Sequence, residues 1–261
     1  MARTFLRTTL SASLALSAAA ATAAPIDLTP WTALTLNFPG GQGAGSWVLE
    51  PGATAVKQVI NADPSFYLDN TNRSSYTMDG SWQVLPGDGD DDYMGFAFGY
   101  QNSSNFYLFD WKKGTQSYAG TNAAEGMTIK KFTGATGDGL VDLSIAEMWE
   151  NQVDYGDMSV LATNHSSTAG WEYNTLYDFH LTFDAAAGQF TIVVKDGATT
   201  LWDQTVADST FSSGQFGFYN NSQMNVRYAG FEAAPIPEPG TYALMLSGLV
   251  ILGFIGARRR A

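Results

Sequence analysis

The segment "DDDYMGFAFGYQNSSNFYLFDWKKGTQSY", residues 90–118, contains the pattern that decides the fold. In its first half, large side chains alternate with glycine or alanine, and side chains two positions apart lie on the same face of a β-strand. The large side chains expected on one face are Met94, Phe96, Phe98 and Tyr100. After a polar turn at residues 101–105, a second strand carries aromatic or aliphatic side chains on both faces. The segment therefore predicts two strands, and the second either is central in its sheet or displays aromatic side chains in a groove.

Both ends of the chain have the composition of targeting segments. Residues 1–23 combine two arginines, an apolar run and a small-x-small site, which predicts a cleaved signal peptide. Residues 241–257 are uncharged and apolar, and Arg258, Arg259 and Arg260 follow them. At about 1.5 Å per residue this segment is about 25 Å long, which suits a transmembrane helix. The arginines indicate a cytoplasmic C-terminus, so the residues between the two segments are expected to be exported.

The stretch "PIPEPGTYAL" lies at the start of the C-terminal segment, with Pro237, Glu238 and Pro239 at its centre. The order of Pro-Glu-Pro, apolar span, arginine cluster and chain end resembles the PEP-CTERM sorting signal. This resemblance covers residues 235–261. It implies recognition by an exosortase, a membrane-embedded cysteine protease, and delivery to the surface or extracellular matrix of a Gram-negative bacterium. The alternative is an ordinary single-span anchor behind a proline-rich hinge.

Residues 24–234 form one domain of about 210 residues, which is large enough to fold around its own core. The chain contains no cysteine, so the exported domain folds without disulfide bonds. Eight of the 13 basic residues and 24 of the 25 acidic residues lie in this range, which leaves a net charge near −16. Such a charge argues against binding to nucleic acid or anionic lipid, and it favours divalent cations.

Short runs of alternating apolar and polar residues follow one another along this domain, separated by clusters of Gly, Asn, Asp and Ser. This pattern is typical of an all-β sandwich. Strands are expected at residues 46–49, 56–60, 76–85, 93–100, 106–111, 127–132, 177–183, 190–195, 199–204, 214–219 and 225–231. A helical turn is expected at residues 145–151, and a loop is expected at residues 39–45.

The segment quoted first resembles the signature of the thrombospondin C-terminal domain. Further similarity lies in "QVINADPSFYLDN", "GSWQV", "GWEYNTLYDFHLTF" and "GQFGFYNNSQMNVRYAGFE", so that the resemblance spans about residues 47–232. It implies an antiparallel two-sheet β-sandwich of the concanavalin A-like, L-type lectin-like jelly-roll class, with bound calcium, a role in adhesion and no catalytic activity. The sequence departs from animal thrombospondins in having no cysteines and no EGF-like or calcium-repeat modules before the domain, so the resemblance predicts the fold and not the animal partners.

Asp88, Asp90, Asp91 and Asp92 crowd four carboxylates into five positions, and a bound cation relieves the repulsion between them. Calcium takes six to eight oxygen ligands, so "PGDGDDDY" can supply half of a site. The spacing is not that of an EF-hand, because Tyr93 stands at the position that requires glycine. From the residues alone, a solvated acidic turn is an equal alternative. The resemblance favours calcium, with Asp90, Asp91 and Asp92 as the matching part.

Other candidate sites have weaker support. Secondary candidates for calcium ligands are Asp138, Asp142, Asp154, Asp157, Asp69 and Asn70. Glu147 and Glu150 flank Trp149 and resemble the acid–base pair of a glycosidase, but ordinary surface glutamates are the preferred interpretation. His165 and His180 lack the spacing of zinc ligands, and no G-x-S-x-G motif occurs.

The sequence thus predicts an exported, calcium-stabilised, lectin-like surface or matrix protein. It would bind exopolysaccharide, another glycan or a surface protein, and it would contact the membrane only through its C-terminal segment before processing. The competing hypothesis is a secreted polysaccharide-acting enzyme, a glycoside hydrolase or lyase, on the same jelly roll. A third hypothesis is a structural protein whose only role is to be sorted and deposited. A convergent pair of carboxylates in a groove would distinguish the enzyme from the binding protein.

Overall fold

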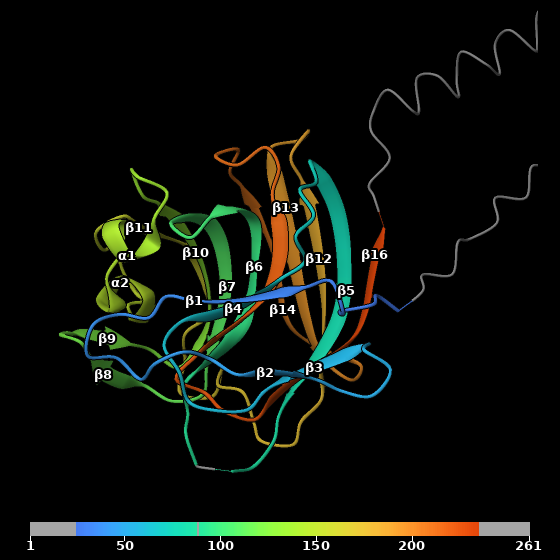
Figure 1. Ribbon diagram of the computed structural model, residues 1–261, viewed down its shortest axis with the longest axis horizontal. Helices are drawn as coiled ribbons and strands as arrows, with labels where there is room; N and C mark the ends of the chain where they lie inside the picture. Colours follow the sequence, from blue (N-terminus) through green and yellow to red (C-terminus); the bar gives the residue numbers. More distant parts are fainter. Residues whose placement is uncertain (1–24, 88, 235–261) are drawn as a thin grey trace, which may run out of the picture.

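The computed structural model describes residues 25–87 and 89–234. The predicted signal peptide, Asp88, and the predicted sorting and transmembrane segments lie outside these residues. Among the residues described, no helix is long and apolar enough to cross a membrane. Most of the described elements are β-strands, and they form two large sheets (Figure 1).

The two large sheets have seven strands each. Sheet A consists, in spatial order, of β1 (Thr32–Thr35), β4 (Ser65–Leu68), β15 (Gln215–Asn221), β6 (Tyr93–Asn102), β7 (Asn105–Lys112), β10 (Gly126–Thr133) and β11 (Met158–Thr163). Sheet B consists of β14 (Thr199–Ala207), β13 (Gln189–Asp196), β12 (Tyr177–Asp184), β5 (Ser75–Val84), β16 (Val226–Ala234), β3 (Ala55–Gln58) and β2 (Trp47–Leu49). The remaining elements are the hairpin β8 (Gln116–Tyr118) and β9 (Thr121–Ala123) and the short helices α1 (Gly139–Asp142) and α2 (Ile145–Trp149).

All the described strand pairs are antiparallel, which confirms the predicted all-β sandwich. Each strand expected from the sequence overlaps a strand of the structure, and the expected helical turn is α2. The alternating pattern does not reveal β1, β4, β8, β9, β11 or α1. Most of these elements have only three or four residues, too few to establish a period.

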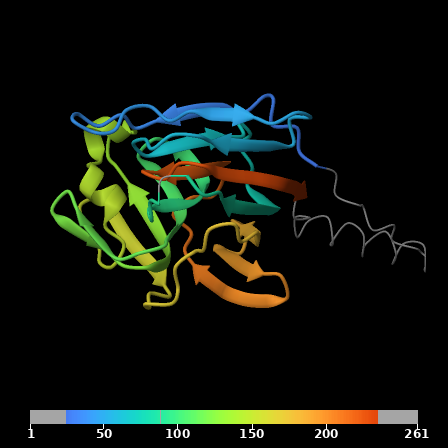
Figure 2. The ribbon, with the colours of Figure 1, turned by 90° about the horizontal axis from the view of Figure 1, so that it is seen from below.

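Two apolar cores lie on the two faces of sheet A. The first core fills the space between the sheets, and β6 and β7 contribute Met94, Phe96, Phe98, Tyr107, Phe109 and Trp111 to it. The second core includes Phe106 and Leu108 of β7, together with residues of α2 and β9. In Figures 1 and 2 the helices and the β8–β9 hairpin lie together at one side of the molecule, away from the β13–β14 hairpin. Because β7 lies between β6 and β10 and contributes side chains to both cores, it is confirmed as a central strand with two apolar faces.

The position of Tyr100 differs from the sequence prediction. It lies in the second core and not in the first core with the other large side chains of β6. Gly99 has a φ of +55°, and the register between β6 and β7 shifts between Phe98 and Asn102. A bulge of this kind turns the residues beyond it to the opposite face of the strand. Glycine adopts positive φ without the steric strain of a Cβ atom.

Candidate metal centre

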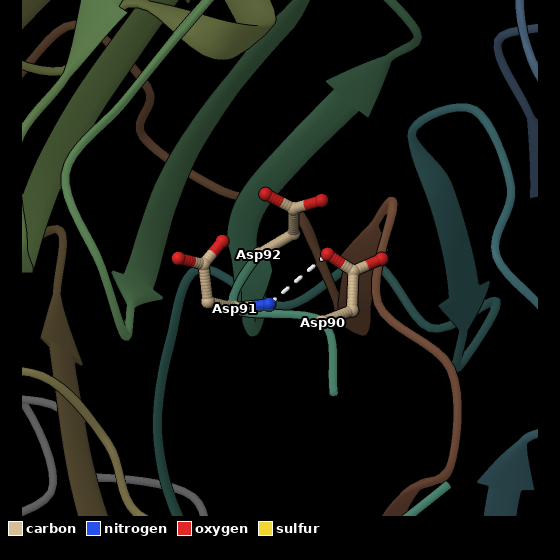
Figure 3. A group of neighbouring side chains, drawn as sticks. All are labelled: Asp90, Asp91 and Asp92. Atoms are coloured by element: carbon tan, nitrogen blue, oxygen red, sulfur yellow. Dashed lines mark hydrogen bonds between the residues drawn. The ribbon is translucent and has the colours of Figure 1, made fainter. Parts of the chain in front are cut away.

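Three carboxylates converge where the loop before β6 enters the strand. One carboxylate oxygen from each of Asp90, Asp91 and Asp92 lies within 4.8 Å of the other two, and Figure 3 shows the three side chains at this point. Across residues 25–87 and 89–234, no other three metal-ligating side chains come this close together. The structure therefore brings together the predicted ligands that it describes, and Asp88 lies outside the described residues.

Hydrogen bonds hold the acidic loop in position. The side chain of Asn61 donates to Oδ2 of Asp90 at 2.7 Å, and the backbone N–H of Asp91 donates to Oδ1 of Asp90 at 3.0 Å (Figure 3). The backbone N–H of Asp92 donates to Oε1 of Gln223 at 3.0 Å. The conformation of the loop is thus determined by the protein itself, with the carboxylates already directed toward one another.

Lys112 places a cation inside this cluster. Its ammonium group lies 2.6 Å from Oδ1 of Asp92 and 3.3 Å from Oδ1 of Asp91, and its side chain is fully buried. It also donates to Oε1 of Gln116 at 2.9 Å and lies 4.7 Å from the ring centroid of Trp149. Burial raises the pKa of Asp92, and the Lys112 ammonium opposes that rise. One positive charge offsets three carboxylates only in part, so the cluster still favours a further cation.

A cavity of about 230 Å³ opens beside the cluster. Its lining residues are Gln42, Asp90, Asp92, Gln116, Tyr118, Trp149 and Ser222. Gln42 comes from the predicted loop at residues 39–45, and its amide donates to Oγ of Ser222 at 2.8 Å. Tyr118 is 43% exposed and packs edge-on against Trp149, with ring centroids 5.0 Å apart. The cavity therefore has polar groups and carboxylates on most sides and an aromatic wall on one.

The groups at this site fit a hard cation such as calcium. Calcium binds six to eight oxygen atoms at about 2.3–2.6 Å, mainly from carboxylates, carbonyls and water. Asp90, Asp91 and Asp92 supply only oxygen donors, whereas zinc sites in proteins usually include histidine or cysteine. Gln42 and Ser222, whose side chains each carry an oxygen atom, line the same cavity, and water can complete the coordination shell. Lys112 uses two of the same carboxylates, so it is expected to weaken the affinity for the ion.

The secondary candidates for calcium ligands lie apart from this cluster. Asp138, Asp142 and Asp154 each accept hydrogen bonds from nearby backbone N–H groups. Asp69 forms an ion pair with Arg73, and Asn70 donates to the carbonyl oxygen of Pro30 at 2.9 Å. None of these residues, nor Asp157, belongs to the group formed by Asp90 to Asp92. The described part of the chain therefore contains no second cluster of carboxylates built from them.

Glu147 and Glu150 are buried, which corrects the interpretation that they are surface glutamates. Glu147 forms a capping box at the start of α2, with its Oε2 accepting from the backbone N–H of Ser144 at 2.6 Å. Its Oε1 accepts from the backbone N–H of Asp157 at 2.6 Å. Oε1 of Glu150 accepts from the backbone N–H of Gln152 at 2.8 Å. Both carboxylates stabilise the local backbone, so they do not present themselves as an acid–base pair.

The two histidines lie in separate environments. His165 shares a hydrogen bond of 2.9 Å with Thr128. His180, on the outer face of sheet B, lies between Asp79 at 2.6 Å and Thr182 at 3.0 Å. A carboxylate, a histidine and a hydroxyl group in this order also form the catalytic triad of many hydrolases. Here, however, β12 is paired on both sides, with β5 and β13. Its backbone N–H groups are therefore engaged in the sheet and do not form an oxyanion hole.

Lys112, Asn61 and Gln42 are site residues that sequence analysis misses. Lys112 directly follows the predicted strand at residues 106–111, and the structure pairs it with Tyr93 at the start of β6. The available signal was therefore a lysine at the end of one strand of a hairpin and acidic residues at the start of the other. Asn61 and Gln42 come from distant loops and carry no such signal.

Two seven-stranded antiparallel sheets packed face to face, with an acidic loop at the start of a central strand, define a lectin-like β-sandwich. Residues 42–234 match the thrombospondin C-terminal region, and the chain belongs to this family. Residues 235–260 match the PEP-CTERM protein-sorting motif, which indicates export and sorting to the cell surface of a Gram-negative bacterium.

This chain spans only a part of the length of the curated relatives that it matches. Thrombospondin-2 of Gallus gallus is 30% identical over 190 residues, which are 70% of this chain and 16% of that protein. Cartilage oligomeric matrix protein of Bos taurus is 28% identical over 190 residues, 70% of this chain and 25% of that protein. The solved exoplasmic/lumenal domain of VIP36, in its Ca2+/Man2-bound form, has a TM-score of 0.52 at 8% identity, covering 81% of this chain and 84% of that one. This likeness shows a shared fold.

Proposed function

We propose that the chain is a non-catalytic, lectin-like protein that holds calcium at Asp90, Asp91 and Asp92 and binds glycan or a neighbouring protein at the cell surface or in the matrix. The observation that carries this proposal is the convergence of three carboxylates beside a cavity with an aromatic wall. It is supported by the VIP36 domain, a protein of the same fold solved with Ca2+ and Man2. Asp88 is a further candidate ligand.

Calcium at this position would neutralise the carboxylates and offer coordination sites to hydroxyl groups. Gln42 and Gln116 line the adjoining cavity and provide amide groups for hydrogen bonds. The exposed ring of Tyr118 provides an apolar surface for a sugar ring. An acidic protein repels polyanions, so neutral or cationic exopolysaccharide is the expected class of ligand.

Calcium is expected to raise the melting temperature of the purified mature protein by several degrees. A ligand that binds only the folded state stabilises it by about 2.7 kcal/mol at 100 times its Kd. Extracellular calcium modules have Kd values of about 0.1–1 mM, so tens of millimolar calcium should suffice. Differential scanning fluorimetry of the wild type and of an Asp91→Asn, Asp92→Asn variant measures the effect. Equal melting temperatures of the wild type in calcium and in chelator would show that the loop is only a solvated turn.

The same two proteins, with and without calcium, test the ligand. Wild-type protein with calcium should bind exopolysaccharide of the producing bacterium in a pull-down or glycan array, and chelator or the double substitution should abolish that binding. Magnesium should substitute poorly, because it requires a tighter octahedral shell. A calcium-dependent rise in melting temperature without any glycan bound would retain the metal site and direct the search to a protein partner.

For processing, we propose a signal peptide at residues 1–23, a mature domain at residues 24–234 and a sorting segment at residues 235–261. The match to the sorting motif supports this division. An exosortase would recognise Pro237, Glu238 and Pro239, while the segment at residues 241–257 spans the membrane and Arg258 to Arg260 remain cytoplasmic. Mass spectrometry of surface protein from the producing bacterium should find a C-terminus near the Pro-Glu-Pro motif. Mature surface protein that still contains Arg260 would rule out this processing.

A further inference from the structure

A second buried ion pair lies in the second core, separate from the acidic loop. Asp110 is on β7 and Lys130 is on the neighbouring strand β10, at diagonal positions on one face of sheet A. Nζ of Lys130 lies 2.7 Å from Oδ2 of Asp110, and both side chains are fully buried. Lys130 also donates to the carbonyl oxygen of Met148 at 3.0 Å and lies 5.0 Å from the ring centroid of Tyr93. Water has no access to either group.

As an ion pair, this arrangement is costly. Oδ1 of Asp110 has no hydrogen-bond partner, although it is buried, and an unpaired buried oxygen destabilises the folded state. Removing two charges from water also carries a large desolvation penalty. Burial raises the pKa of Asp110 and lowers the pKa of Lys130, while the attraction between the two groups opposes both shifts. Compared with the same groups in water, the neutral amine and the neutral carboxylic acid are favoured.

We propose that Lys130 and Asp110 condense to an intramolecular amide bond that cross-links β10 to β7. Nζ of the neutral amine adds to Cγ of the neutral carboxylic acid. A C–N bond forms, the C–O bond to the hydroxyl group breaks, and that hydroxyl leaves with one amine proton as water. No electrons are gained or lost, and no further reactant is needed. The fold holds the two groups in contact, and well-oriented groups react as if their concentration were about 10⁵–10⁸ M.

The amide suits the site better than the ion pair does. The carbonyl oxygen of Met148, 3.0 Å from Nζ of Lys130, remains available as the acceptor for the amide N–H. The amide bond carries no charge, so no buried charge remains at this position. Asp110 also retains only one of its two side-chain oxygens, which leaves one fewer buried oxygen to be hydrogen-bonded. The chain has no cysteine, so the bond would give an exported protein the covalent link between strands that disulfides provide elsewhere.

Peptide mapping of the exported protein tests the bond directly. Trypsin cleaves after lysine and arginine but not after an acylated lysine. Digestion of the unfolded protein should therefore yield residues 74–112 joined to residues 114–131, with the mass of the two peptides less one water. Separate peptides 74–112 and 114–130, each at its full sequence mass, would overturn the proposal. A loss of water within peptide 74–112 that is not joined to a second peptide is an Asp-Gly succinimide and would also count against it.

Two substitutions make the test specific to this pair. Lys130→Met should abolish the joined peptide. Lys131→Met is the matched control, because Lys131 lies next in the strand and its Nζ is also 2.7 Å from a carboxylate, Oδ2 of Asp208. That pair is partly exposed, and its contacts lower the pKa of Asp208, so its acid stays ionised and unreactive. In the Lys131→Met protein trypsin cleaves neither after the substituted residue nor after the acylated Lys130, so the expected product is residues 74–112 joined to residues 114–195. If the Lys131→Met protein lacked this joined peptide, the assignment to Lys130 would be wrong.

Discussion

Replacement of Lys112 by methionine is expected to lower the free energy of unfolding of the calcium-free protein by about 3–5 kcal/mol, since removing one partner of a buried ion pair leaves the other charge uncompensated. Asp92 is buried, and its Oδ1 lies 2.6 Å from the Lys112 ammonium. Urea unfolding followed by tryptophan fluorescence, in chelator, measures the loss. Calcium should recover a larger part of the stability in the variant than in the wild type, because the ion takes over the charge that Lys112 supplied.

The adjacent residue provides a control for the Lys112 experiment. Lys113 pairs with Glu172, whose side chain is 69% exposed. An exposed ion pair contributes about 0–1 kcal/mol, so Lys113→Met should cost far less than Lys112→Met. If both variants unfolded at the same urea concentration and responded equally to calcium, Lys112 would not be the internal counter-ion of the acidic loop.

Some of the strands predicted correctly, such as β5, β12 and β13, have burial that alternates with a period of two, whereas β6 and β7 are buried along most of their length and were predicted from their aromatic residues. β5, for example, alternates between buried and more exposed positions along its whole length, and that pattern is visible in the sequence. β4 is a short strand in which all four residues are buried, so its sequence has no alternation to detect. In β11 only Met158 is buried, and a register shift interrupts its pairing with β10. These two strands are defined by their neighbours in sheet A and not by their own pattern.

The acidic part of the candidate metal site could be predicted because Asp90, Asp91 and Asp92 are consecutive in the sequence. Their carboxylates therefore lie close together and repel one another in any fold. The basic part depends on the register of the β6–β7 hairpin. Counting outward from the pair Asn102 and Asn105 places Tyr93 opposite Gly114, but the bulge at Gly99 shifts the register so that Lys112 lies there instead. A bulge of this kind is set by packing on both faces of the strand. The sequence pattern alone therefore does not locate the counter-ion.

Gly95→Ala is expected to destabilise the protein by about 3 kcal/mol, at the upper end of the usual range for overpacking. Gly95 lies opposite Asp110 in the central β6–β7 pair. A Cβ atom at this position would overlap the carbonyl oxygen of Phe109 and lie 3.0 Å from Cα of Asp110. Both atoms belong to the backbone, so no side chain can rotate to make room. The melting temperature, followed by circular dichroism, should fall by roughly 10 °C.

Ala97→Gly tests whether this loss comes from the close approach of β7 and not from any change on this face of β6. Ala97 lies two residues further along the same face and is fully buried in the second core. Removing its methyl group should cost only about 1 kcal/mol, through lost packing and added chain entropy. The small residues of the opening motif would then have distinct roles, with Gly95 required by the neighbouring backbone and Ala97 by the packing of the second core. A Gly95→Ala protein as stable as the wild type would mean that β7 can move away from β6, and that the β7 backbone does not restrict residue 95 to glycine.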